Sequence, residues 1–178
     1  MRPKLPKLSL YLAIGFALTC TLLLDRESAS ATASANPESL PHWLVPVAAP
    51  AFLVQEFRAP LTKYGAGHRG LDYNVQDQQL VYAPATGTIA FSGLVALKPV
   101  LVLQHDAGLK SAFEPVCGEV PVGTHVLAGE PIGVVCGNVN YESHCAPWLC
   151  LHFSARRDGK YLSPRVFIGG MQTAQLRY

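Results

Sequence analysis

The sequence predicts an all-β domain, folded as a compact antiparallel β-sandwich or barrel. Short apolar runs bounded by turn residues recur after residue 86, and this is typical of such folds. No part of this region keeps the apolar period of an amphipathic helix. The Asp158-Gly159 pair suits the positive backbone angles of a hairpin turn between the last two runs. The runs are 87–93, 99–104, 110–116, 131–135, 150–155 and 161–168.

The N-terminus has the order of a secretory signal. Basic residues up to Lys7 precede an uncharged, mostly apolar run over 8–24, and small residues follow, including Ala33-Ser34-Ala35. This order predicts export from the cytosol with cleavage at a small-x-small site. The apolar run also approaches the roughly 18 residues that span a bilayer, so a retained anchor is the alternative. We expect residues 1–35 to be a signal peptide or membrane anchor and the protein to be secreted or held at the cell envelope. Any contact with the membrane would be through this segment.

The rest of the chain is predicted to be a linker followed by one domain. Residues 36–56 are rich in proline and show no clear period, as expected for a linker. Residues 57–178 are expected to form the domain, since the roughly 140 residues after the signal region suit a single hydrophobic core. The net charge of +2 is spread thinly, with no basic cluster longer than Arg156-Arg157. Nucleic acid is therefore not an expected partner.

The cysteines favour disulfides. Excluding Cys20, which lies in the apolar N-terminal run, they are Cys117, Cys136, Cys145 and Cys150, an even number in a chain expected to leave the reducing cytosol. Proximity along the chain favours pairing Cys117 with Cys136 and Cys145 with Cys150, although four cysteines allow three pairings. Zinc ligation by several cysteines is the alternative, and it lacks a Cys-x-x-Cys pair.

The strongest local feature is segment 64–73, in which a glycine-rich approach precedes His68 and Asp72. Imidazole and carboxylate are both common zinc ligands. The glycines would let the backbone bend so that the two side chains converge. Taken alone, such a pair is more typical of an ordinary turn than of a metal site.

A second candidate segment is the run from Cys150 to Ala155, which contains His152. Strand alternation puts Cys150 and His152 on one face and Leu151 and Phe153 on the other. One face would then pack against the core while the other meets a site. From this segment alone, a half-buried histidine with satisfied hydrogen bonds is the preferred interpretation.

Together the two segments resemble the LytM and lysostaphin type of peptidoglycan metalloendopeptidase, which has an early His-x-x-x-Asp loop and a late His-x-His strand. The resemblance covers roughly residues 57–164 and includes 81–89, 122–133 and 161–164. It implies the lysostaphin-type fold, also called the duplicated hybrid motif. It also implies that Zn²⁺ is bound by His68, Asp72 and His152. Three protein ligands would leave one position open, as a catalytic zinc requires.

The resemblance implies hydrolysis of a peptide bond in the stem or cross-link peptides of peptidoglycan. Two further histidines normally assist, by taking a proton and by stabilising the tetrahedral oxyanion. This sequence lacks both, because Cys150 replaces one of them and Pro115 stands at the position of the other. Proline can neither donate nor accept a side-chain proton, so metal binding and turnover are separate questions.

Three residues are candidates to replace the missing histidines. Glu114 would act as a carboxylate base, His144 as an imidazole from the loop before Cys145, and Cys150 as a thiol beside the metal. Each has a plainer interpretation, since Glu114 and His144 suit solvated positions and Cys150 suits a disulfide. A Cys150 thiolate bound to zinc would close the fourth position and make the site structural.

The sequence leaves two functions open besides a plain exported β domain without metal. The first is a zinc-dependent endopeptidase with a substitute base. The second is a non-catalytic domain that binds peptidoglycan or regulates another cell-wall hydrolase. The retained ligand set favours the enzyme. The remaining histidines, His42, His105 and His125, match no ligand position and are predicted to be surface or turn residues.

Overall fold

The computed structural model describes residues 41–137 and 143–169. The predicted signal peptide or anchor, 1–35, lies outside these residues, as does Cys20. Among the described residues, no helix is both long enough and apolar enough to cross a membrane.

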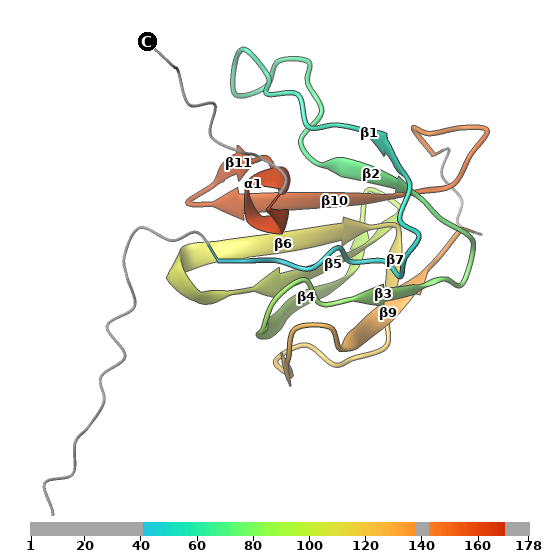
Figure 1. The fold of residues 1–178 in the computed structure, drawn as a ribbon, viewed down its shortest axis with the longest axis vertical. Helices are drawn as coiled ribbons and strands as arrows, with labels where there is room; N and C mark the ends of the chain where they lie inside the picture. The colour runs from blue at the N-terminus through green and yellow to red at the C-terminus, as the bar shows by residue number, and fades with distance from the viewer. Residues whose placement is uncertain (1–40, 138–142, 170–178) are drawn as a thin grey trace, which may run out of the picture. The chain divides into compact units, whose positions relative to one another are not determined.

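The described chain is built from antiparallel strands in two sheets (Figure 1). The larger sheet has the order β1-β2-β10-β6-β5-β4-β8, with β11 paired to β10, and the smaller has the order β3-β9-β7. The strands of the larger sheet are β1 (Leu53–Gln55), β2 (Leu71–Asn74), β4 (Gly87–Val95), β5 (Lys98–Gln104), β6 (Leu109–Glu114), β8 (His125–Val126), β10 (Cys150–Arg157) and β11 (Lys160–Leu162). Those of the smaller are β3 (Leu80–Tyr82), β7 (Val116–Gly118) and β9 (Pro131–Val135). The helical pieces are η1 (Asp106–Gly108) and α1 (Arg165–Ile168). The predicted all-β antiparallel class is confirmed.

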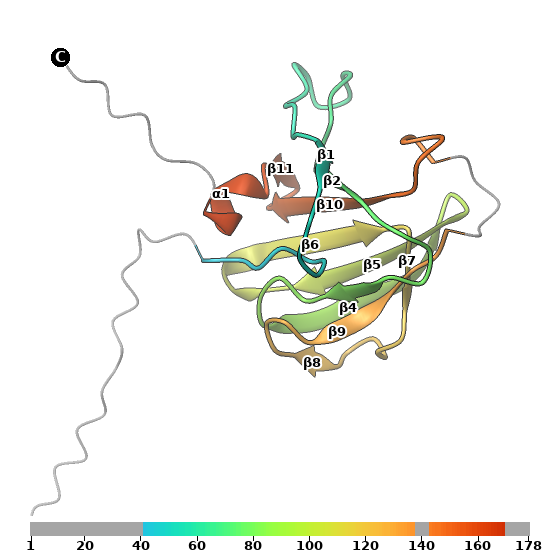
Figure 2. The same ribbon diagram turned by 45° about the vertical axis from the view of Figure 1, so that its right-hand side comes forward.

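Both sheets contribute to one hydrophobic core. Val81 and Ile132 of the smaller sheet are buried in the same cluster as Leu101, Phe113 and Phe153 of the larger. The rings of Phe113 and Phe153, on neighbouring strands β6 and β10, stack with centroids 5.2 Å apart. Strands β2, β10 and β6 lie side by side in both views (Figure 1 and Figure 2). This central part of the larger sheet positions the candidate site described below.

Much of the segment predicted as a linker, residues 36–56, folds as part of the domain. Trp43 is only 1% exposed and stacks on Phe167 at a centroid distance of 4.5 Å. Val47 is also buried, and β1 pairs with β2. The predicted linker 36–56 therefore does not extend over residues 43–56. Its prolines prevent a regular period, but they leave single large side chains free to pack into the core.

Two predicted runs are divided differently in the structure. The run 110–116 breaks at Pro115, where the chain leaves β6 and enters β7 of the other sheet. Proline has no N–H to donate to a strand ladder, which explains the break. The run 161–168 is not one strand, because β11 ends at Leu162 and α1 follows. The hairpin before it is confirmed, since Asp158 and Gly159 have φ angles of 50° and 75°.

Both favoured disulfides are present. Cys117 and Cys136 are bonded with their Cα atoms 5.8 Å apart, and Cys145 and Cys150 are bonded with theirs 6.0 Å apart. The first joins β7 to the residue after β9. The second ties the segment before β10 to the first residue of that strand.

His105 is buried, so its prediction as a surface or turn residue is wrong, whereas His42 and His125 are exposed. Its Nδ1–H donates to the carbonyl oxygen of Thr86 at 2.9 Å, and its Nε2 lies 2.8 Å from the hydroxyl of Ser111. A polar side chain can be buried when its hydrogen bonds are satisfied in this way. Burial lowers the pKa of His105 below its ordinary value of 6.5, against an opposing effect of the bond to Thr86.

Because His105 is buried, we expect the folded protein to become less stable in mild acid. Because the pKa of His105 is lowered by folding, the unfolded chain binds the proton first as the pH falls through 6.5. The free energy of unfolding should therefore decrease below that pH, by up to about 1.4 kcal/mol per pH unit from this group. Urea denaturation between about pH 7 and pH 5 measures the effect. A His105→Gln variant should be less stable at pH 7 but show a shallower decrease. Equal slopes for the two proteins would contradict the prediction.

Candidate metal centre

The register of two neighbouring strands brings the candidate ligands together. Asp72 in β2 is directly opposite His152 in β10. His68 lies four residues before Asp72 and forms an isolated β-bridge with Arg58. Since residues directly opposite each other in a sheet have neighbouring side chains, the pairing itself creates the contact between Asp72 and His152.

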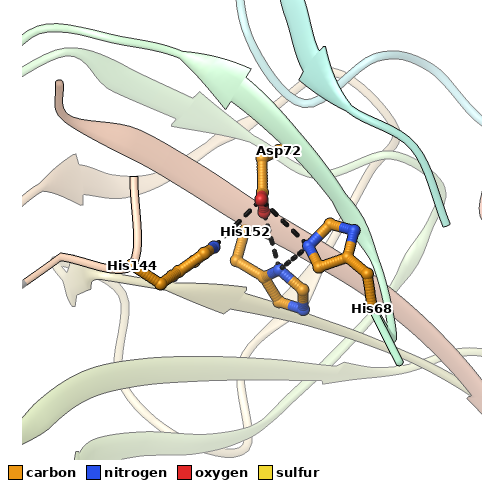
Figure 3. A group of neighbouring side chains, drawn as sticks. All are labelled: His68, Asp72, His144 and His152. Carbon is orange, nitrogen blue, oxygen red and sulfur yellow. Dashed lines mark hydrogen bonds and ion pairs between the residues drawn. The ribbon is translucent and has the colours of Figure 1, made fainter. Parts of the chain in front are cut away.

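The three side chains meet at one point (Figure 3). His68 Nε2 lies 2.9 Å from Asp72 Oδ2, and His152 Nδ1 lies 2.7 Å from Asp72 Oδ1. The two imidazole nitrogens, His68 Nε2 and His152 Nδ1, are 3.2 Å apart. Asp72 is fully buried and His68 nearly so. The loop imidazole, the carboxylate and the strand imidazole therefore converge as the motif requires.

The donor set suits a divalent cation. The Nδ1–H of His68 donates to the backbone carbonyl of Glu56 at 2.8 Å. A neutral His68 then carries its lone pair on Nε2, which faces Asp72 and His152. Support of a ligand histidine by a backbone carbonyl is common in metal sites, because it fixes the tautomer and the ring orientation. Two imidazole nitrogens and a carboxylate are ligands that zinc accepts, so these residues fit the metal that the motif implies.

His144 joins the cluster from the loop before β10. Its Nε2 lies 2.9 Å from Asp72 Oδ2, and its side chain is 43% exposed. The potential ligand atoms of His68, Asp72, His144 and His152 all lie within 4.8 Å of one another. The nearby Cys145–Cys150 disulfide holds this loop, and Cys150 Sγ is 3.8 Å from His144 Nε2. Of the three candidate catalytic residues, His144 is the one that the structure brings into contact with Asp72.

Asp72 is the charged centre of this cluster. Burial alone would raise the pKa of Asp72. The hydrogen bonds from His144 and His152, together with the charges of both imidazoles, lower the pKa by more than burial raises it. The net result is a pKa well below the ordinary value of 3.8, so the carboxylate is ionised. The pKa of His144 is raised above 6.5, mainly by its hydrogen bond to Asp72 and in spite of burial. One buried negative charge therefore faces three imidazoles.

The other two catalytic candidates have different positions. Cys150 is in a disulfide and 1% exposed, so the hypothesis that it acts as a free thiol is wrong. Glu114 is directly opposite His152 on β6, but its Oε1 forms an ion pair with Lys98 Nζ at 3.0 Å. It lies outside the cluster of potential ligand atoms around Asp72.

Gly70 is a positioning residue that sequence reasoning missed. A Cβ atom at Gly70 would lie 2.5 Å from the carbonyl oxygen of Phe153 and 2.6 Å from His152 Nε2. No side chain fits there unless β10 or the His152 ring moves. A glycine between His68 and Asp72 could have signalled this close approach of the backbone to another strand.

A Gly70→Ala substitution is therefore expected to weaken metal binding. Displacing the His152 ring should reduce zinc affinity at least about tenfold, as changes around a metal ligand commonly do. A competition titration with a chromophoric chelator measures this. Gly93→Ala is the matched control, because its Cβ would meet only the flexible ring of Phe91 at 3.2 Å. Unchanged affinity in the Gly70 variant would refute the positioning role.

The cluster lies in an open groove with a volume of about 900 Å³. It is lined by residues of β10, β6, β5 and β4 and by residues of the adjoining segments, and His68, His144 and His152 are among them. Alternation along β10 explains the arrangement, since Leu151 and Phe153 are fully buried on the core side. The groove thus lies over the outward face of the larger sheet.

The antiparallel β fold and a histidine–carboxylate cluster in an open groove define a protein of the metallopeptidase type. Residues 66–164, more than half of the chain, match the model of Peptidase family M23. The chain belongs to this family, and the resemblance found in the sequence is confirmed.

The chain is also similar in sequence to mycobacterial proteins. Uncharacterized proteins of Mycobacterium tuberculosis and Mycobacterium bovis are 36% identical to the chain over 110 residues, which are 62% of this chain and 43% of theirs. The match thus spans less than half the length of these relatives.

Solved structures share the fold at lower identity. The catalytic domain of the antimicrobial peptidase lysostaphin from Staphylococcus simulans has a TM-score of 0.56 at 20% identity, over 67% of this chain and 92% of that one. A zinc-containing peptidase from Vibrio cholerae has 0.54 at 18%, over 66% and 37%. A chain of the SpoIIQ–SpoIIIAH pore-forming complex has 0.60 at 20%, over 73% and 92%. These similarities confirm the lysostaphin-type fold.

Proposed function

We propose that this protein is an exported, zinc-dependent endopeptidase that hydrolyses peptide bonds in the stem or cross-link peptides of peptidoglycan. The observation that carries the proposal is the convergence of His68 Nε2, the Asp72 carboxylate and His152 Nδ1 in a groove. Membership of Peptidase family M23 supports the reaction and the substrate. The N-terminal signal pattern supports export.

The roles of the chain's residues follow from their positions. His68, Asp72 and His152 would hold the metal, with His68 oriented by the carbonyl of Glu56. A zinc ion held by these residues would supply Lewis acidity, which would polarise a scissile carbonyl and lower the pKa of a bound water. The groove holds the peptide extended across the cluster, so that the scissile bond is positioned before reaction.

His144 is the residue that we assign to proton transfer. Its Nε2 is next to Asp72, while 43% of its side chain is exposed, so it can exchange protons with solvent. Its ring centroid is 5.7 Å from that of His152. It thus supplies an imidazole from a loop, although both family positions for the assisting histidines hold other residues, Pro115 and Cys150.

The same residue favours a second function. Because the ligand atoms of His144 and of the three proposed ligands lie within 4.8 Å of one another, four protein ligands could surround the metal. A closed four-ligand zinc site is structural, with no position for a reacting group. The protein would then bind peptidoglycan without cutting it, or regulate another cell-wall hydrolase.

Zinc analysis combined with a cleavage assay separates these functions. We expect the purified protein to contain one zinc per chain by elemental analysis. We also expect it to release new muropeptides from at least one member of a panel of peptidoglycans, as detected by mass spectrometry. Stoichiometric zinc without cleavage of any wall type would support the second function. Absence of zinc would contradict both.

A further inference from the structure

We infer that the end of the groove around Arg156, four residues along β10 from His152, binds a carboxylate group of the substrate peptide. This end is lined by Arg69, Lys110 and Arg156, which we call the cationic end. The identity of the peptide as a peptidoglycan stem or cross-link peptide rests on the proposed function. The binding of a carboxylate rests on the arrangement of these three side chains.

The strands set the distance between the two ends of the groove. Arg156 lies four residues after His152 on β10, and both side chains line the groove. At about 3.3 Å per residue, this separation is roughly 13 Å along the strand. An extended peptide rises by the same amount per residue. For a peptide that lies extended along β10, the bound carboxylate would belong to a residue about four positions from the scissile bond.

Two of the cations are directly opposite each other. Arg156 of β10 pairs in register with Lys110 of β6, and both face the groove. Like charges directly opposite each other destabilise a sheet, because their side chains are neighbours. An anion between them would remove this repulsion. The pair thus has the arrangement of an anion site.

The third cation is held next to them. Tyr161 of β11 is opposite Arg156, and the guanidinium carbons of Arg156 and Arg69 lie 5.8 and 5.9 Å from its ring centroid. Arg69 is also oriented by hydrogen bonds from Nη2 to the carbonyl oxygens of Lys63 and Gly65, at 3.2 and 3.0 Å. A guanidinium held in one orientation is suited to bidentate binding of a carboxylate.

These charges are not neutralised within the part of the chain that the structure describes. None of its ion pairs includes Arg69, Lys110 or Arg156. By contrast, the lysine on the metal side, Lys98, is paired with Glu114 at 3.0 Å. The uncompensated positive charge of the groove is thus concentrated at the cationic end. It would attract an acidic peptide in one orientation, with its carboxylate away from the metal.

Equilibrium binding of two matched peptides tests this inference. The probes are a fluorescein-labelled peptidoglycan stem peptide with free carboxylates and the same peptide with carboxamides in their place. Anisotropy is measured with the full chain, both with zinc and without it. We expect the carboxylate peptide to bind at least about tenfold more tightly in both cases, since a carboxylate forms charge-assisted hydrogen bonds with these cations and a carboxamide does not.

The variants locate the effect. Lys110→Gln combined with Arg156→Gln should remove the preference and bind both peptides equally. Lys160→Gln is the control, because it removes one positive charge from β11 outside the groove lining, and it should keep the preference. Equal binding of the two peptides by the unmodified protein, or failure to bind either, would overturn the inference. If the preference is found but the purified protein holds no zinc and cleaves no peptidoglycan, the inference stands and only the proposed function is overturned. If the double variant still preferred the carboxylate peptide, the carboxylate would not bind at the cationic end, and the inference would be overturned.

Discussion

The largest expected effect is that of Asp72→Asn, which should reduce zinc affinity by more than about 100-fold and abolish peptidoglycan cleavage. The substitution keeps the size of the side chain but removes the one negative charge that faces His68, His144 and His152. Zinc content after dialysis measures the loss. Asp77→Asn is the matched control, because Asp77 accepts a bond from the backbone N–H of Gly137 and lies outside the cluster.

Metal-dependent stability gives a measurement that does not depend on activity. A ligand that binds only the folded state stabilises it by about 2.7 kcal/mol at a free concentration of 100 times its Kd. Zinc should therefore raise the melting temperature of the unmodified protein and of Asp77→Asn, but not that of Asp72→Asn. If Asp72→Asn retained stoichiometric zinc, Asp72 would not be a ligand. A parallel His152→Ala variant would test the other strand in the same way.

The core of the site could be predicted because its signals are local. His68 and Asp72 are four residues apart in one glycine-rich segment, and alternation along a single strand places His152 opposite the core-facing side chains. The strand runs of the sheet follow from the same period of two. What the sequence lacked was the register that puts Asp72 and His152 directly opposite each other. The family motif supplied that information instead.

The features that escaped prediction depend on contacts between distant segments. Trp43 packs in the core against Phe167 and Phe153, and the ring nitrogens of the buried His105 are satisfied by Thr86 and Ser111. None of these partners can be inferred from the local composition. In the same way, alternation places Arg156 on the His152 face, but only the pairing of β10 with β6 puts Lys110 opposite it. Long-range pairing is the missing information in each case.

Replacing His144 with Ala is expected to lower kcat by about 10²- to 10⁴-fold while zinc remains bound. The reason is that His144 contacts Asp72 from a half-exposed loop, whereas the three proposed ligands are held by strands and a bridge. Steady-state cleavage of a defined muropeptide and zinc content, measured on the same sample, check both parts. His125→Ala is the control, since His125 is exposed on β8 and outside the groove lining. A loss of zinc as large as that of Asp72→Asn would make His144 a fourth ligand and favour the non-catalytic function.

Removing the Cys145–Cys150 disulfide is a second test of the role of His144. A Cys145→Ser and Cys150→Ser double variant should lose only about 2 kcal/mol of stability, because the closed loop is short, and Cys117–Cys136 would remain. It should nevertheless lower kcat, because a released loop no longer holds His144 beside Asp72. Adding His144→Ala to this variant should then cause little further loss, since both changes remove the same imidazole from the site. Multiplying effects would instead show that the disulfide and His144 act independently.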